Sequence, residues 1–300
     1  MRFRRVRTQA GLEIQRLDGA DWCPLDGDPP WGPSPFAAAW ELATADRHLA
    51  HTDVLLPFSP LSFRDFLLSE RHNVDAARGM VGRFYRPSAA IASAYEKMTR
   101  TTFPVFRPKK LFYRQPIYYM SNAMTIVPSG TPVAFPTYST ALDFELEVGF
   151  VLKDGLLNAS PDQATDAIGA FVLLNDFSAR DVQRAEMASG LGPQKSKHFL
   201  SSMSATAAGA DDILPRIDAL TGSVQINGRT VSTVSSSGLQ WTLGDVLAHA
   251  SRDEQLFPGE VFGLGTLPGG SGMETGCWLE PGDTLRLVLD GVGEVEHRVV

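Results

Sequence analysis

Cysteine, long apolar runs and excess positive charge are all scarce in this 300-residue chain, and each scarcity excludes a class of protein. Its two cysteines, Cys23 and Cys277, lie far apart without a CxxC pair, which indicates neither a disulfide framework nor a zinc site. No apolar run approaches about 18 residues, so we expect no membrane span. A formal net charge of -7 argues against general binding of nucleic acid or of an anionic membrane. These features predict a cytoplasmic protein that acts on small molecules.

The first 50 residues differ in pattern from the rest. Four arginines open the chain without an apolar stretch behind them, so the start does not resemble a secretory signal. Alternating stretches over residues 1–26 predict a small strand-rich unit, and a Pro- and Gly-rich linker follows at 26–35. The spacing of apolar residues then predicts a helix to about residue 50. We therefore expect a small N-terminal unit over 1–50 and a catalytic domain over 51–300.

Three later segments pair a hydroxyl residue with an acid or amide three positions on, which is the signal for a capped helix. The pairs are Ser160 with Gln163, Ser178 with Asp181 and Thr242 with Asp245. Strands are expected near 260–265 and 283–290, and Asp290-Gly291 predicts the turn of a hairpin. This alternation of short strands and few helices is typical of a mixed, strand-rich domain.

The stretch DFELE at 143–147 places three acids on alternate positions of a predicted strand. Asp143, Glu145 and Glu147 would share one face, because successive strand side chains point to opposite sides. A solvated face of a half-exposed sheet is the simplest explanation. Two glutamates spaced by two residues nonetheless repel each other unless a cation, usually a divalent metal, lies between them.

Four further segments complete a pattern with DFELEVGFVL: FRDFLLSERH at 63–72, LNDFSARDVQ at 174–183, GPQKSKHF at 192–199 and GLGT at 263–266. In this order they resemble the fumarylacetoacetate hydrolase (FAH) superfamily, over roughly residues 55–290, and most closely its fumarylacetoacetases. The resemblance implies an α+β, mostly β fold, a mixed β-roll or β-sandwich with a few short helices. It also implies a homodimer.

The resemblance implies that four carboxylates bind a divalent cation, namely Asp65, Glu145, Glu147 and Asp176. Such hard oxygen ligands suit Mg²⁺ or Ca²⁺, with Mn²⁺ as a further option. Asp176 taken alone would more often be a turn residue, and Asp143, which has no place in the family pattern, is expected beside the site or at the surface. Lys197 stands at the family's lysine position, where an ammonium would offset the excess negative charge.

Five residues match substrate-binding positions of the family: Tyr119, Arg180, Gln183, Gly265 and Thr266. Arg180 and Gln183 lie three apart on a predicted helix and so share a face, which in the family points toward substrate. Gly265 permits close approach of the backbone, and Thr266 adds a hydroxyl. Without the resemblance, the helix face could equally be solvated and Tyr119 could be a packed core aromatic.

His72 follows Asp65 by seven residues, the spacing of the catalytic histidine in the fumarylacetoacetases. Imidazole titrates near neutral pH, so it can accept a proton from water. Asp75, three residues later, is expected to hold the imidazole if 70–76 is a helix capped by Ser69. The family's glutamate after a Gly-Asp turn is absent, since Thr284 stands there. About 20 extra residues between His72 and residue 116 suggest an enlarged lid.

These features predict a divalent-metal-dependent hydrolase that cleaves a carbon-carbon bond in a 1,3-diketo acid, a β-diketone, or an acylpyruvate-like substrate. His72 would activate water, and the enolate would leave with help from Lys197 and Gln183. A decarboxylase, hydratase or tautomerase would use the same metal-bound enolate without activated water, and the absent glutamate slightly favours this alternative. A noncatalytic metal- and ligand-binding protein is the third alternative.

Overall fold

Two strands without an exposed residue, β8 (Glu145–Leu152) and β9 (Ile168–Asp176), form the centre of the fold. Their Val, Leu and Phe residues suit a pleated surface that is covered on both faces. The strands pair antiparallel, with Phe150 opposite Phe171 and their rings 6.0 Å apart. The acid stripe of the sequence therefore begins a buried strand.

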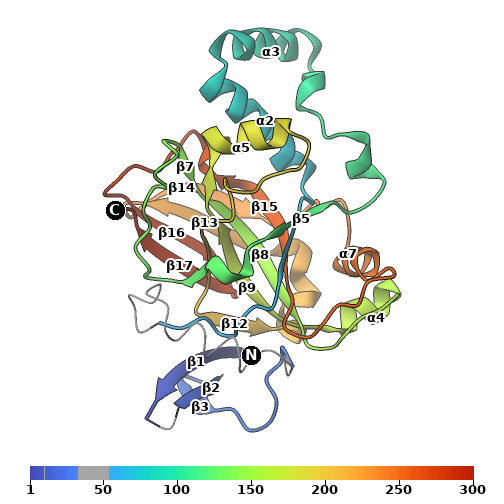
Figure 1. Ribbon diagram of the computed structural model, residues 1–300, viewed down its shortest axis with the longest axis vertical. Helices are drawn as coiled ribbons and strands as arrows, with labels where there is room; N and C mark the ends of the chain where they lie inside the picture. Colours follow the sequence, from blue (N-terminus) through green and yellow to red (C-terminus); the bar gives the residue numbers. More distant parts are fainter. Residues whose placement is uncertain (10, 33–53) are drawn as a thin grey trace.

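The computed structural model describes residues 1–9, 11–32 and 54–300, and β8 and β9 belong there to an 11-stranded sheet (Figure 1). The order is β3-β2-β1-β12-β9-β8-β15-β4-β5, and β11 pairs with β6 and β9. β4 runs parallel to β15, which brings β4 close to β8 across β15. The other strands of this sheet are β1 (Arg2–Thr8), β2 (Gly11–Asp18), β3 (Asp21–Pro24), β4 (Phe63–Phe66), β5 (Tyr118–Ser121), β6 (Ile126–Pro128), β11 (Ser201–Met203), β12 (Thr206–Gly209) and β15 (Val261–Ser271).

A second, four-stranded antiparallel sheet packs against the first, and the main hydrophobic core lies between them. Its order is β14 (Arg229–Ser235), β13 (Thr221–Ile226), β16 (Thr284–Leu289) and β17 (Gly293–Arg298). Along β16 and β17 buried and more exposed residues alternate, as expected for a sheet with one face on a core. The predicted hairpin around Asp290-Gly291 is confirmed. A short pair, β7 (Leu142–Asp143) with β10 (Ser178–Ala179), lies beside the start of β8.

Helices are few and mostly short, so the predicted α+β, mostly β class is confirmed. They are α2 (Glu70–Phe84), α3 (Arg86–Thr99), α4 (Pro161–Asp166), α5 (Arg180–Ala188), α6 (Ala210–Ile213), α7 (Leu243–Ala250) and α8 (Gly272–Thr275). Single 3₁₀ turns lie at Pro104–Phe106, Lys110–Tyr113, Ala123–Thr125 and Leu214–Ala219. The expected helix before residue 50 lies outside the described residues.

Two of the three predicted capping boxes are confirmed. Ser160 caps α4 and Thr242 caps α7, each with the reciprocal bond from its third helical residue. The box predicted for Ser178 with Asp181 is wrong, although α5 itself forms. The carboxylate of Asp181 instead accepts hydrogen bonds from the Ser139 hydroxyl at 2.6 Å and the Thr140 amide at 2.9 Å. A tertiary contact thus replaces the local one.

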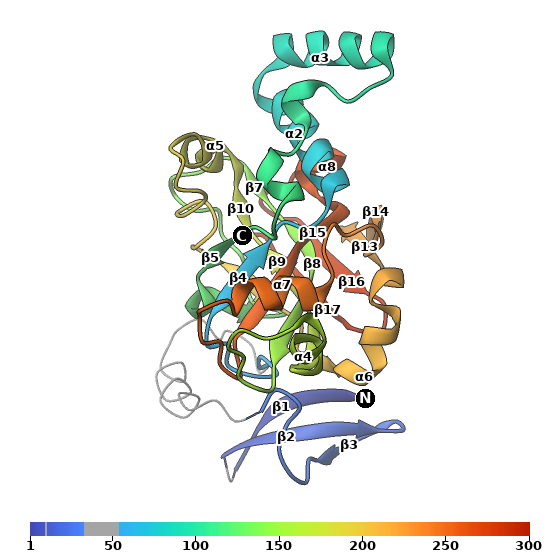
Figure 2. The same ribbon diagram turned by 90° about the vertical axis from the view of Figure 1, so that its right-hand side faces the viewer.

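The segment from Glu70 to Thr99 forms a projecting pair of helices, α2 and α3 (Figures 1 and 2). A role of this segment as an enlarged lid stays a prediction. Ser69 caps α2 as predicted, because its hydroxyl accepts a hydrogen bond from the His72 amide at 3.1 Å. A small separate core of Val74, Ala92 and Phe106 joins the two helices. The helix α2 contacts the body of the protein at Gly79, which lies against the Met273 carbonyl, and at Phe84, whose ring centroid is 6.2 Å from that of Trp278. His72 lies in the first turn of α2, at the base of this arm.

The N-terminal strands β1 to β3 extend the large sheet, because β1 pairs with β12 (Figure 2). The expected strand-rich opening segment is present in the described residues 1–9 and 11–32. A division into domains at residue 50 stays a prediction.

A buried histidine gives the fold a testable pH dependence. The Nδ1 atom of His297 lies 2.8 Å from the Thr131 carbonyl oxygen, and the centroid of its ring lies 5.6 Å from that of the Phe177 ring. Burial lowers the pKa of His297 to about 4. An unfolded histidine has a pKa of about 6.5, so the unfolded chain binds more protons between these values. The stability that neutral His297 provides is therefore present above pH ~6.5 and is lost as the pH falls toward 4.

Between pH 7 and pH 5, the wild-type protein should lose about 2 kcal/mol more unfolding free energy than the His297→Gln variant. Urea unfolding at both pH values measures the difference. Equal losses in the two proteins would show that His297 is not neutral and buried as described.

Candidate active site

Four predicted metal ligands come together around a glycine in the middle of the large sheet. Asp65 lies on β4, Glu147 lies on β8, and β15 runs between these strands with Gly263 opposite Asp65. A Cβ atom built on Gly263 would lie 2.6 Å from Oδ1 of Asp65 and 2.9 Å from Oε2 of Glu147. The missing side chain therefore lets two carboxylates converge.

Glu145 at the start of β8 and Asp176 at the end of β9 complete the acid cluster. We define the acid cluster as Asp65, Glu145, Glu147 and Asp176. All four are at most 5% exposed, so the solvated-face explanation of the stripe is wrong. Burying four carboxylates costs several kcal/mol unless cations or hydrogen bonds compensate.

Lys197 supplies one compensating charge from inside the cluster. Its Nζ contacts Oε2 of Glu145 and lies 2.9 Å from Oδ2 of Asp176. Although burial opposes it, the attraction of these carboxylates raises the pKa of Lys197 above its ordinary value. The sequence-based expectation that this lysine offsets the acids therefore agrees with the contacts.

The four carboxylates have unequal affinity for protons. Burial raises the pKa of Asp65 to about 8, with Asp176 adding to the shift. Burial, with Asp65 and Glu145 nearby, also raises the pKa of Glu147 well above its ordinary value. Glu145 is also buried, but Arg180 and Lys197 lower its pKa to about 2. Arg180 and Lys197 thus contact Glu145 directly, whereas Lys197 acts on Asp65 and Glu147 from a distance and does not overcome the effect of burial there.

The Asp65–Glu147 side is where the cluster fits a cation. Oδ1 of Asp65 and Oε2 of Glu147 are buried oxygens without a hydrogen-bond partner, and both face Gly263. Unpaired buried carboxylate oxygens are the donors that a hard divalent cation prefers. Within the described residues, no three acid, histidine or cysteine side chains already stand in a coordinating arrangement. Lys197 and the Tyr119 hydroxyl contact the oxygens of Glu145 and Asp176 instead.

Arg180 and Gln183 share a face of α5, as predicted. Nη1 of Arg180 donates to the Gln183 side-chain oxygen at 2.9 Å, and Nη2 donates to Glu145 at 2.6 Å. Nε donates to Asp143 at 2.7 Å, so all arms of the guanidinium are engaged. Asp143, expected beside the site or at the surface, is wholly buried beside it.

The remaining substrate-binding candidates also border the cluster. The Tyr119 hydroxyl donates to Asp176, and its ring stacks on His198 at 6.4 Å. The Thr266 hydroxyl lies 3.5 Å from Oε1 of Glu147. Gly265 has a φ of 79°, and a Cβ there would lie 2.3 Å from the Phe66 carbonyl oxygen. The absence of a side chain at Gly265 therefore lets the backbone of β15 approach β4. Contact of Tyr119, Thr266 and Gly265 with substrate stays a prediction.

His72 is paired with an acid that sequence reasoning missed. Its Nδ1 lies 3.0 Å from Oε2 of Glu274 on α8, which is an ion-pair distance without the alignment of a hydrogen bond, and both side chains are almost fully buried. Glu274 is itself held, because it accepts hydrogen bonds from the Ser271 hydroxyl at 2.9 Å and the Gly269 amide at 3.1 Å. Ser271, which lies opposite Glu145 in the pairing of β15 with β8, donates to Glu274, so the His72–Glu274 pair lies beside the acid cluster.

The expected contact between His72 and Asp75 is wrong. The Asp75 carboxylate turns to Arg78 at 2.6 Å and to Arg71 at 3.7 Å on the outside of α2. The neighbouring arginines thus bind the Asp75 carboxylate, while the His72 side chain points into the protein. The sequence does carry a signal for Glu274, since Ser271 followed three residues later by glutamate matches a helix-capping pattern.

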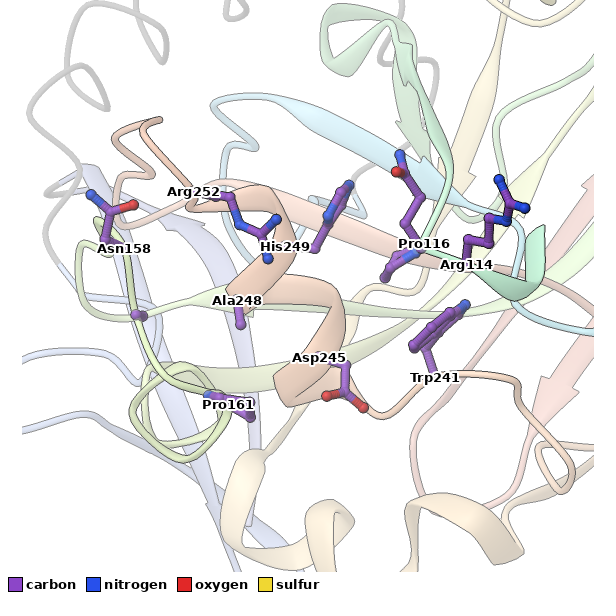
Figure 3. Close-up of a pocket in the computed structure, with 11 residues that line it drawn as sticks. Arg114, Pro116, Asn158, Pro161, Trp241, Asp245, Ala248, His249 and Arg252 are labelled. Carbon is purple, nitrogen blue, oxygen red and sulfur yellow. The ribbon is translucent and has the colours of Figure 1, made fainter. Parts of the chain in front are cut away.

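A separate cavity of about 470 Å³ lies between α7 and the segment before β5 (Figure 3). Arg114, Trp241, Asp245, His249 and Arg252 are among its lining residues. None of the predicted site residues lines it. Burial, with Arg252 nearby, lowers the pKa of His249. The paired carboxylates and the His72–Glu274 pair therefore mark the better candidate for an active site.

Comparison with known proteins identifies the family. Residues 88–300 match the family model of the fumarylacetoacetate (FAA) hydrolase C-terminal domain. The chain belongs to the fumarylacetoacetate hydrolase family. Asp65 and His72 lie before the first matched residue, so their assignment rests on the motifs and on the geometry described above. The predicted family is thereby confirmed.

Curated relatives of this FAH-family protein carry different activities in their names. Oxaloacetate tautomerase fahd2 of Xenopus laevis is 27% identical over 188 residues, which cover 62% of this chain and 59% of the relative. Oxaloacetate tautomerase FAHD1 of Mus musculus is 27% identical, covering 62% and 81%. Fumarylacetoacetase of Arabidopsis thaliana is 30% identical, covering 56% and 51%. The chain thus spans little more than half of the frog and plant proteins.

Solved structures share the fold over the whole chain. A 5-carboxymethyl-2-hydroxymuconate delta-isomerase from Mycobacterium smegmatis aligns with a TM-score of 0.67 at 18% identity, covering 100% of this chain and 99% of that one. A fumarylacetoacetate hydrolase from Exiguobacterium antarcticum aligns with a TM-score of 0.68 at 17% identity, with the same coverage. The FAH-type fold is therefore confirmed.

Within the part of the chain that the structure describes, no helix of this FAH-family protein has the length and apolar character needed to cross a membrane. The cytoplasmic location and the homodimer stay predictions.

Lys197 should be essential for the stability of the acid cluster. Lys197→Met removes the only ammonium that contacts Glu145 and Asp176 among the described residues, so two buried carboxylates lose a counter-charge. We expect the unfolding free energy at pH 7 to fall by about 3–5 kcal/mol. Lys195→Met is the matched control, since Lys195 is exposed and should change stability by less than about 1 kcal/mol. Similar losses in the two variants, measured by urea unfolding, would contradict this account.

Proposed function

We propose that this FAH-family protein is a divalent-metal-dependent hydrolase that cleaves a carbon-carbon bond in a 1,3-diketo acid or acylpyruvate-like substrate. The pairing of His72 with Glu274 beside the acid cluster carries the proposal. A histidine whose one nitrogen is held by a carboxylate presents the other nitrogen as a base. That arrangement serves activation of water, which a hydrolase needs and a tautomerase does not.

A divalent cation, Mg²⁺ or Ca²⁺ with Mn²⁺ as a further option, would be held by Asp65, Glu145, Glu147 and Asp176. When bound, it would supply Lewis-acid stabilisation of developing negative charge on the dicarbonyl oxygens. The unpaired oxygens of Asp65 and Glu147 support this role.

The chain's own residues then divide the remaining work. His72 would take a proton from water at Nε2, and Glu274 would stabilise the imidazolium through Nδ1. Attack of hydroxide would form a carbon-oxygen bond at the distal carbonyl, and collapse of this adduct would break the carbon-carbon bond to give a carboxylic acid and an enolate. The enolate carbon would then take the proton held by His72, which restores the base. Lys197 and Gln183 would offset the charge of this enolate, while Tyr119, Arg180, Gly265 and Thr266 would border the substrate.

Tautomerisation of a 2-oxo dicarboxylic acid is the second candidate function. Two curated relatives are named oxaloacetate tautomerases, and their matches cover 62% of this chain. The reaction needs stabilisation of the same enolate together with proton transfer, but no activated water. Decarboxylation would use the same enolate without activated water, and hydration would use it with addition of water. A noncatalytic ligand-binding role would leave the His72–Glu274 pair without a function.

Product analysis separates these functions. Purified protein with Mg²⁺ should convert at least one member of a panel of acylpyruvates and β-diketo acids into two fragments. In ¹⁸O-labelled water, one fragment should carry the label, as mass spectrometry can detect. An isomer of unchanged mass, formed from oxaloacetate or from the panel, would reject hydrolysis in favour of tautomerisation. No turnover of any compound would reject both.

The roles of His72 and its partner are tested by three variants. His72→Ala should reduce kcat by about 100-fold or more, and Glu274→Gln should cause a smaller but clear loss, because the imidazole remains but is poorly oriented. Asp75→Asn is the control, since the charged partners of Asp75 among the residues that the structure describes are Arg71 and Arg78. We expect it to retain wild-type kcat. A loss in Asp75→Asn together with full activity in Glu274→Gln would reverse the assignment.

A further inference from the structure

Asp143 is a buried acid that the proposed chemistry leaves without a role. Its Oδ1 accepts hydrogen bonds from the amides of Phe144 and Gly272, both at 2.8 Å. Its Oδ2 accepts from the Met273 amide at 3.1 Å and from Nε of Arg180 at 2.7 Å. Each oxygen therefore accepts two hydrogen bonds. The donors belong to Phe144 just before β8, to Arg180 on α5, and to the first two residues of α8. One carboxylate joins three segments that are distant in sequence.

The contact with α8 bears directly on Glu274. Gly272 and Met273 are the first two residues of α8, and Glu274 is the third. A single helical turn is not stable by itself, so its location depends on what holds its ends. Asp143 holds the first two amides, while the Ser271 hydroxyl accepts from the Glu274 amide at 3.3 Å. The distance between Glu274 and His72 thus depends on Asp143.

The fit between Asp143 and α8 leaves no free space. A Cβ atom on Gly272 would lie 2.5 Å from Oδ1 of Asp143 and 2.5 Å from the Cys277 carbonyl oxygen. Only glycine allows the backbone to approach the carboxylate this closely. A shift of α8 relative to Asp143 would therefore require the surrounding backbone to move.

The contact with Arg180 leads to the acid cluster. The same guanidinium that donates to Asp143 donates through Nη2 to Glu145 at 2.6 Å. Arg180 is 1% exposed, so its orientation is fixed by these partners and by Gln183. Asp143 is therefore connected by hydrogen bonds to Glu145 through Arg180. It is also connected to Glu274 through the backbone of α8.

We propose that Asp143 is a positioning residue that fixes the His72–Glu274 pair relative to the acid cluster. Its carboxylate oxygens fix the position of α8 by accepting hydrogen bonds from the amides of Gly272 and Met273. Oδ2 also fixes the orientation of Arg180, which in turn contacts Glu145. The inference rests on the proposed function, in which His72 acts on a substrate held at the cluster. A purely structural role, neutralisation of Arg180, would affect stability but would leave the His72 imidazole of the folded protein unchanged.

The test uses the imidazole nitrogens of His72 in ¹⁵N-labelled protein, assigned by their absence in His72→Gln. Asp143→Asn keeps the shape but replaces one acceptor oxygen with an NH₂ donor, which repels either an α8 amide or Arg180. The His72 nitrogen resonances should move toward those of Glu274→Gln. kcat should fall by about 10- to 100-fold, the range for residues that orient a catalytic group, while KM changes much less.

Asp181→Asn is the matched control. It removes a charge from α5, the helix that carries Arg180, but Asp181 contacts Ser139 and Thr140 and not α8. Its His72 resonances should be those of the wild type. If Asp143→Asn does not fold, Gly272→Ala tests the same contact without changing a charge, and it should move the resonances in the same direction.

Wild-type His72 resonances in a folded Asp143→Asn or Gly272→Ala variant would overturn the proposal. This outcome is distinguishable from failure of the proposed function, because the resonances are recorded without substrate. Shifted resonances in a protein that turns over no diketo acid would reject the function and keep the positioning role. An equal shift in Asp181→Asn would overturn the specificity of Asp143.

Discussion

Burial of four carboxylates around Gly263 is the constraint on which the rest of the site depends. Three neighbouring strands, β8, β15 and β4, bring Asp65 and Glu147 to one point, and the glycine between them leaves space that a side chain would fill. Arg180 contacts Glu145, and Lys197 contacts both Glu145 and Asp176. Oδ1 of Asp65 and Oε2 of Glu147 have no hydrogen-bond partner, which in a buried location favours either protonation or a cation.

The same cluster explains why one fold can serve several reactions. Enolate chemistry needs concentrated positive charge near two carbonyl oxygens, and a cation held by the acid cluster would provide it. Water activation needs something further, which the His72–Glu274 pair at the base of the α2–α3 arm would supply. Relatives named as tautomerases and as fumarylacetoacetases both match this chain.

The sequence predicted the parts of the site that depend on local pattern. Alternation on β8 and the capping of α2 by Ser69 determine where Glu145, Glu147 and His72 point, and these follow from a few neighbouring residues. Glu274 was missed because its contact with His72 joins residues about 200 positions apart, and the spacing of Asp75 offered a local substitute. The capping box at Ser178 failed for the same reason, since Asp181 bonds to a distant turn. In both cases a contact with a residue distant in sequence replaces the local contact that the spacing predicted.

Binding of a metal tests the central claim most directly. Titration of the metal-free wild-type protein with Mn²⁺, followed by calorimetry and by electron paramagnetic resonance of the free ion, should give one site per chain. Glu147→Gln, which removes an unpaired buried oxygen, should weaken binding by at least ~10-fold, whereas Glu280→Gln, an exposed acid, should not. Absence of binding by the wild type, or equal affinity in Glu147→Gln, would contradict the account.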